Sequence, residues 1–164
     1  MRAKNLLGRK AAAIAVAAVL ALGLSSCGFA DTSSTPPSDP FQNALYNALN
    51  YDRAMAGLPR LTWSPKLANA AGTWAHQMSN ANTLYHQNLT ALLYSPDYSN
   101  YYTLGENILV GPGSMSPNSI ELAWHNSPPH YANITSRAFN VVGVGYYRGP
   151  DGRIWAVQDF GGLY

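Results

Sequence analysis

The chain has 164 residues, of which 11% are charged, and its formal net charge is +2. No basic run occurs beyond the first ten residues, so the electrostatic footprint of a nucleic-acid-binding protein is absent and we expect no nucleic acid partner. Cys27 is the single cysteine in the chain, which excludes an intrachain disulfide.

The beginning of the chain has the composition of an export signal. Four basic residues occur among the first ten, and an unbroken apolar run of 14 residues follows at 11–24. A membrane-spanning helix needs roughly 20 apolar residues, so this run is short for a span and typical of a signal-peptide core. Removal of the segment leaves six Lys and Arg residues against eight Asp and Glu.

The apolar run ends in Leu-Ser-Ser-Cys, which resembles a bacterial lipobox. The resemblance implies that residues 1–27 are a lipoprotein signal peptide and that Cys27 is linked to a diacylglycerol. Two or more acyl chains hold a protein stably on a membrane. The chain is therefore predicted to be lipid-anchored on the extracytoplasmic side of the cell envelope. An ordinary signal peptide with an incidental cysteine, or an uncleaved anchor, remains the alternative.

A Ser/Thr/Pro/Gly stretch follows at residues 28–40 and lacks any apolar period. Such composition predicts a flexible tether, which at thirteen residues reaches at most roughly 45 Å. The remaining residues, 41–164, have the length of one folded domain.

Two amphipathic helices are predicted next, starting at Pro40 and Pro65, each with proline at its first position and a capping residue before it. Residues 58–63 form an extended connection between them. Residues 79–103 are polar and carry no pattern that we can assign, and 104–110 predict a short strand. Ser-Pro pairs start two more helices, at Pro117 and Pro128.

The C-terminal part predicts a β-hairpin. Residues 139–148 and 153–160 are rich in Val, Tyr and Trp, and Gly149-Pro150-Asp151-Gly152 supplies the turn between them. Helices followed by a terminal hairpin predict an α+β or three-layer fold. Tryptophans 63, 74, 124 and 155 are assigned to the core.

Glutamate is rare, because Glu106 and Glu121 are the two in the chain. His86 precedes the first and His130 follows the second. Pro128-Pro129 interrupts the helix after Glu121, so His130 can turn back toward it. Two imidazoles and two carboxylates in one cleft would serve a divalent metal such as zinc, or would perturb one another's pKa values. Separate surface caps and core hydrogen bonds are the alternative.

The order of short motifs along residues 41–161 resembles the CAP superfamily of cysteine-rich secretory proteins, venom allergens, plant pathogenesis-related proteins and bacterial exported domains. The resemblance implies a three-layer α-β-α sandwich whose central cleft carries His86, Glu106, Glu121 and His130. Tyr131 departs from the family's pattern, which has Arg there. The matching motifs are Asn50-Tyr51-Asp52-Arg53, Leu61-Thr62-Trp63, Tyr85-His86, Gly105-Glu106-Asn107-Ile108, Ser127-Pro128-Pro129-His130, Val142-Gly143-Val144-Gly145 and Gln158-Asp159-Phe160-Gly161.

The other two histidines have alternatives of their own. His76 lies on the second predicted helix, where a packed or capping role is expected, although it competes with His86 for the place in the cleft. His125 follows Glu121 by four residues, and such a pair on one helix face can form a hydrogen bond.

Two functional hypotheses follow from different classes. The first is a binding module for a small lipid-like or sterol-like ligand, or for an envelope partner, as in some CAP branches. The alternative is a zinc-dependent hydrolase with metal on His86 and His130 and a glutamate as base. No Gly-x-Ser-x-Gly elbow is present, and the single thiol belongs to the anchor. We favour binding over catalysis, and a structural envelope protein is the third class.

Overall fold

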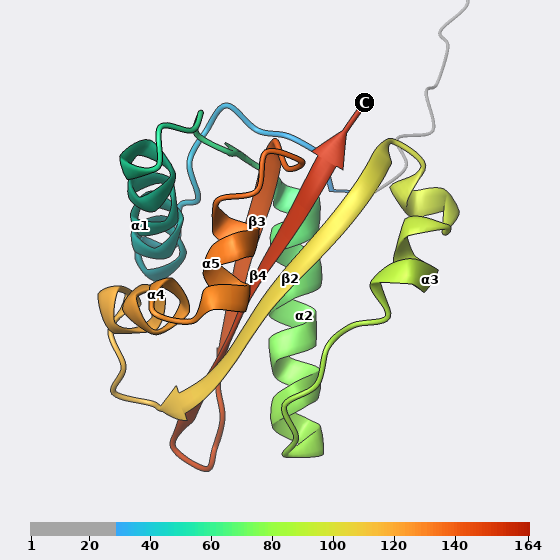
Figure 1. Cartoon of the computed structure of the whole chain (residues 1–164). Coiled ribbons are helices and arrows are strands. Elements are labelled where there is room, and N and C mark those ends of the chain that lie inside the picture. Colours follow the sequence, from blue (N-terminus) through green and yellow to red (C-terminus); the bar gives the residue numbers. More distant parts are fainter. Residues whose placement is uncertain (1–28) are drawn as a thin grey trace, which may run out of the picture.

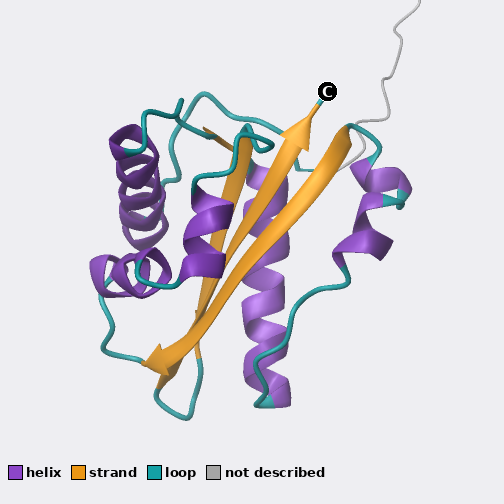
Figure 2. Cartoon of the chain, in the orientation of Figure 1, coloured by secondary structure: helices purple, strands orange, loops and turns teal. Residues whose placement is uncertain are grey.

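The computed structural model describes residues 29–164, which form three layers. Helices α1 (Pro40–Met55), α4 (Pro117–His125) and α5 (Pro128–Ile134) cover one face of a four-stranded sheet, and α2 (Pro65–Ala81) covers the other (Figures 1 and 2). The predicted α-β-α sandwich with a C-terminal hairpin is therefore confirmed. Among the described residues, no helix has the length and apolarity that a membrane crossing requires.

The sheet is built around the last strand of the chain. Its strands are β1 (Thr62–Trp63), β2 (Tyr101–Pro112), β3 (Val141–Arg148) and β4 (Arg153–Leu163), in the order β1-β3-β4-β2. The β1–β3 pair is parallel, whereas β4 pairs antiparallel with both of its neighbours. Because β4 is central and covered on both faces, nearly all of its residues are buried.

Local capping fixes the helix starts that the sequence predicts. The side chains of Asp39, Ser64 and Ser116 accept hydrogen bonds from backbone N–H groups three residues later, at 2.8, 3.2 and 3.1 Å. Each of these capping residues precedes a proline at the first helical position, where a missing N–H costs nothing.

The unassigned stretch contains two short elements beside the beginning of β2. These are α3 (Leu89–Leu93) and a 3₁₀ turn (Pro96–Tyr98). They close a small apolar cluster around Leu67, Tyr98 and Tyr101. The strand that follows is longer than expected, since β2 covers 101–112 rather than 104–110. Of the tryptophans assigned to the core, Trp74 is only half-buried.

The prediction of a flexible tether at residues 28–40 is wrong for the part that the structure describes. Residues 29–39 do not extend away from the domain but lie on it, and Pro37 is buried. Ser33 N–H donates to Trp63 O at 2.8 Å, and Lys66 N–H donates to Ala30 O at 3.1 Å. The Lys66 ammonium also pairs with Asp31 at 3.0 Å. Composition predicted flexibility, but these contacts are tertiary and leave no periodic signal in the sequence.

Helix α2 lies directly on the sheet because two glycines of β3 face it. A Cβ atom at Gly143 would overlap the backbone of Leu67 and Ala68, and one at Gly145 would overlap the backbone of Gly72. Neither neighbour can move without displacing the helix, so only glycine fits at these two positions.

We therefore expect Gly145→Ala to destabilise the domain by at least about 2–3 kcal/mol, because overpacking against backbone has no rotamer by which to relax. Urea denaturation followed by circular dichroism measures the change. Gly72→Ala is the matched control: its Cβ meets nothing beyond its own helix. The control should gain about 0.5–1 kcal/mol from helix propensity. Equal effects of the two substitutions would contradict this account of the interface.

Candidate functional site

The first cluster of polar side chains lies on the α2 face, at the β2 edge of the sheet. Glu106 projects from β2 with its side chain fully buried and accepts a hydrogen bond from His86 Nδ1 at 2.6 Å. The same oxygen accepts the backbone N–H of Gln87 at 3.1 Å. The His86 ring is exposed, so the buried carboxylate holds an imidazole whose other nitrogen faces solvent.

Asp159 adds a second carboxyl to this cluster. It is the β4 partner of Glu106 in the strand register and therefore shares its face. One amide serves both groups: Gln87 Nε2 donates to Glu106 Oε2 at 2.8 Å and to Asp159 Oδ1 at 3.0 Å. Burial raises the pKa of Asp159 well above its ordinary value, and the charge of Glu106 raises it further. Both effects favour the protonated form of the Asp159 carboxyl over the ionised form.

A second cluster lies on the opposite face, because neighbouring residues of a strand point to opposite sides. Asn107 Nδ2 donates to Gln158 Oε1 at 3.0 Å and to the backbone oxygen of His130 at 3.1 Å. Asn133 Nδ2 in turn donates to Asn107 Oδ1 at 2.9 Å. These amides connect β2, β4 and α5 in one buried network.

Glu121 ends this network. Gln158 Nε2 donates to Glu121 Oε2 at 2.8 Å, whereas Glu121 Oε1 has no hydrogen-bond partner within the described residues. Burial raises the pKa of Glu121 to about 8, and the charge of Asp52 contributes to the same direction. The carboxyl is therefore mostly neutral at pH 7, which explains how it tolerates burial with one unpaired oxygen.

The expectation that four side chains meet in one cleft is wrong for Glu121. His86 and Glu106 are in direct contact on the α2 face, but Glu121 belongs to the α4 face and reaches the others through Gln158 and Asn107. The sequence argument treated the two glutamates alike, and it did not assign Glu106 and Asn107 to opposite faces of β2. Whether these residues bind a ligand stays a prediction.

His130 lies between the two clusters. Its backbone oxygen belongs to the amide network, and its half-buried ring has no hydrogen-bond partner at Nδ1 among residues 29–164. Burial lowers the pKa of His130, and the charge of nearby His86 lowers it further. The His130 ring is therefore neutral at pH 7 and available as a donor or acceptor.

The remaining histidines have separate roles. His125 Nδ1 contacts Asp52 Oδ2 at 2.8 Å, so its partner comes from α1 and is not the predicted Glu121. His76 packs on Tyr147 with ring centroids 4.3 Å apart, which agrees with the packed helical role and removes it from competition with His86.

The fit of zinc to these residues is poor. Within the part of the chain that the structure describes, no group of three or more His, Cys, Asp or Glu side chains is arranged as a metal site. The proposed metal ligands His86 and His130 have no third protein ligand beside them, and structural or catalytic zinc uses at least three. We therefore derive no catalytic step through a metal, and the zinc site stays a prediction that the arrangement does not favour.

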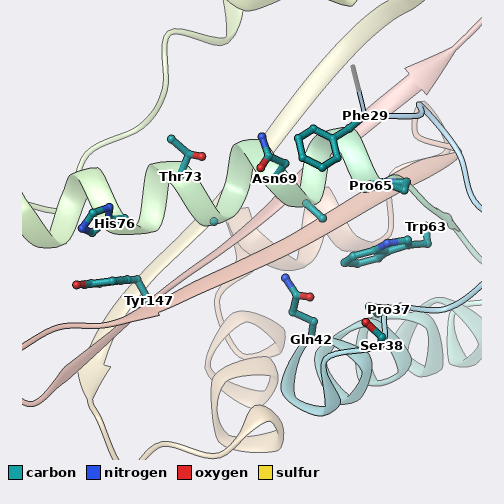
Figure 3. Close-up of a pocket in the computed structure, with 12 residues that line it drawn as sticks. Phe29, Pro37, Ser38, Gln42, Trp63, Pro65, Asn69, Thr73, His76 and Tyr147 are labelled. Atoms are coloured by element: carbon teal, nitrogen blue, oxygen red, sulfur yellow. The ribbon is translucent and has the colours of Figure 1, made fainter. Parts of the chain in front are cut away.

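Two open hollows lie away from the His86–Glu106 pair. One, of about 440 Å³, lies between α1 and α4 and is lined by Ala48, Tyr51, Asp52, Asn118, Glu121, Leu122 and His125. We call it the α1–α4 groove. The other, of about 700 Å³, lies at the opposite edge of the sheet, between Gln42 of α1 and the Asn69–His76 side of α2 (Figure 3). Phe29 and Trp63 lie toward its right-hand end in that view, and His76 and Tyr147 lie at the left.

Sequence reasoning missed the groups that complete both clusters. Gln87 donates to both Glu106 and Asp159, and Asp52 contacts His125. Asp52 and Asp159 were noted as parts of family motifs without a role. An available signal was the position of Asp159 in a predominantly apolar strand, because a carboxyl there must be buried.

Comparison with known proteins gives one family and one fold. The sequence model of the family described as "CAP: Cysteine-rich secretory protein family" matches residues 46–160. The Bacillus subtilis protein YkwD is 30% identical over 142 residues, which cover 79% of this chain and 51% of YkwD. The chain thus spans about half the length of this relative.

Solved structures agree with the fold. An outer surface protein from Borrelia burgdorferi superposes with a TM-score of 0.66 at 19% identity, covering 78% of this chain and 96% of that protein. An extracellular protein with an SCP domain from Bacillus anthracis gives 0.59 at 22% identity, covering 78% of this chain and 44% of that one.

The amide clamp on the two carboxyls generates one prediction. We expect Gln87→Leu to destabilise the domain by about 1–3 kcal/mol at pH 7, because two buried acceptors lose their shared donor. Gln77→Leu, on the exposed side of α2, is the matched control and should stay within about 0.5 kcal/mol. Urea titration of both variants distinguishes them. A neutral Gln87→Leu would show that the clamp contributes nothing to stability.

The raised pKa of Glu121 generates another. In the unfolded chain Glu121 ionises near pH 4.5, and in the folded chain near pH 8, so unfolding between these values releases a proton. Wild-type stability therefore falls as pH rises through this window, by about 1.4 kcal/mol per unit from this group. Glu121→Gln should be increasingly more stable than wild type from pH 5 to pH 8. Denaturant titrations at pH 5, 6, 7 and 8 measure the free energy of unfolding of both proteins. A difference between the two that does not change with pH would contradict the prediction. Asp97→Asn, which alters an exposed carboxyl, is the control.

Proposed function

The chain belongs to the CAP family of cysteine-rich secretory proteins, and from this premise we propose that it is a lipid-anchored extracytoplasmic protein that binds a small apolar ligand in the α1–α4 groove. The family description and the outer-surface and extracellular relatives support an extracytoplasmic location. The predicted lipobox at Cys27 supports the anchor and lies outside the described residues.

The observation that carries the proposal is the composition of the α1–α4 groove. Its volume lies within the range of small-molecule pockets, about 300–1,000 Å³. Tyr51 and Leu122 line it from opposite helices and remain 64% and 58% exposed, so two large apolar surfaces face solvent in one concave site. Apolar surface therefore surrounds a concave site without being packed by the protein itself.

The protonation state of Glu121 in the α1–α4 groove is compatible with an apolar ligand. Glu121 lines the groove as a carboxyl that is mostly neutral at pH 7, so an apolar molecule would not have to cover a charge on Glu121. The carboxylate of Asp52, which also lines the groove, is paired with His125 at 2.8 Å. Its unpaired Oε1 is buried, so a polar contact to a ligand hydroxyl would require the Glu121 side chain to shift toward the groove. Of the four residues predicted for the cleft, Glu121 is the one that lines this groove.

A fluorescent apolar probe tests the proposal on residues 28–164 expressed without the signal segment. We expect N-phenyl-1-naphthylamine to bind with enhanced fluorescence, and Leu122→Asp to weaken its affinity about tenfold, because a charge in an apolar site costs at least about 1.4 kcal/mol. Lipid co-purifying with the wild-type protein should compete with the probe.

Leu84→Asp is the matched control, since Leu84 is also an exposed leucine but lies in the loop after α2, outside the groove. It should leave the probe's affinity unchanged. Equal affinity of wild type and Leu122→Asp, or an equal loss in both variants, would remove the α1–α4 groove as the binding site.

A further inference from the structure

The described chain begins as a segment that is fastened to one end of the domain. Ala30 and Ser33 share backbone hydrogen bonds with Lys66 and Trp63. Asp31 receives the Lys66 ammonium at 3.0 Å and the Asn100 side-chain amide at 3.1 Å. This segment therefore connects the ends of β1 and β2 and is part of the folded body.

The consequence concerns the distance to the predicted lipid. Gly28 is the one residue between Cys27 and Phe29. Two residue steps of extended chain span at most about 7 Å. A tether that is free over thirteen residues would let the domain rotate and move away from the bilayer, whereas a span this short holds the end that carries Phe29 at the headgroup layer.

The surface of that end has the composition of a membrane interface. Phe29, Tyr102 and Tyr164 are 57%, 43% and 91% exposed. The rings of Tyr102 and Tyr164 lie 5.5 Å apart, where β2 begins and β4 ends, beside the C-terminus (Figure 1). Tyr164 N–H donates to the backbone oxygen of Asn100, the residue that also contacts Asp31. Amphipathic aromatic rings are the side chains that membrane proteins concentrate at headgroup depth.

We propose that this aromatic end, formed by Phe29, Tyr102 and Tyr164, lies against the lipid bilayer and sets the orientation of the domain on the membrane. The inference rests on the lipid anchor of the proposed function. The β3–β4 turn then lies at the far end, because β2 and β4 run from one end to the other over about twelve residues, or roughly 35–40 Å. Helix α4 follows the far end of β2 (Figure 1).

Depth-dependent quenching on the full lipidated chain tests the orientation. The acylated Cys27 is unreactive, so a single cysteine introduced as Tyr164→Cys or Asp151→Cys is the one site for a maleimide fluorophore. Both proteins are placed in phosphatidylcholine vesicles that contain lipids brominated on the acyl chain. We expect several-fold stronger quenching at position 164 than at position 151.

Two controls separate the anchor from the orientation. Inserting ten Gly/Ser residues after Gly28 adds about 18 Å of mean reach, so it should remove the difference in quenching while the protein still sediments with vesicles. Cys27→Ser should abolish sedimentation. If the wild-type chain does not sediment with vesicles, the anchor and this inference both fail. If it sediments but positions 151 and 164 are quenched equally, the orientation alone is overturned.

Discussion

Side-chain alternation along β2 is the constraint on which the rest of the polar structure depends. Glu106 and Asn107 are consecutive, so one must face α2 and the other must face α5. Their register partners on β4, Asp159 and Gln158, repeat the division. One edge of the sheet therefore carries a carboxyl pair on one side and an amide pair on the other, and the contacts that Gln87, Asn133 and Glu121 make with these pairs follow from this division.

The buried carboxyls on the two sides of the sheet are stabilised in different ways. On the α2 side, Glu106 accepts three hydrogen bonds, while burial and the charge of Glu106 raise the pKa of its neighbour Asp159 well above the ordinary value. On the α4 side, Glu121 is neutral and uncharged amides make most of the contacts. On the α2 side two carboxyls thus share the amide of Gln87, whereas on the α4 side the carboxyl of Glu121 is itself mostly neutral.

The sequence predicted the elements whose signals are local. Proline after a capping residue marks the starts of the helices, and a Gly-Pro-Asp-Gly turn marks the hairpin, because these features depend on a few adjacent residues. The CAP resemblance added the three-layer arrangement. The full length of β2 was not predicted, since its two ends are stabilised by pairing with a strand some fifty residues later.

The sequence predicted some contacts of the candidate site and not others, and this difference has a physical reason. The His86–Glu106 contact joins residues that the sequence argument had already put together. Glu121 was grouped with them because it is a rare residue type, yet rarity carries no information about which face of a layer a side chain occupies. His125 was paired with a residue of its own helix, whereas Asp52, which is distant in sequence, proved to be its partner.

The position of β4 has a consequence for how the polypeptide reaches its native state. The strand that contacts both neighbours in the middle of the sheet is also the last of the four strands to be synthesised, so no upstream segment can complete the central layer before β4 has left the ribosome. Contacts of such long sequence separation form slowly. The sheet of such a polypeptide cannot fold until β4 has been synthesised. An unfolded chain is also what passage through a translocation channel requires.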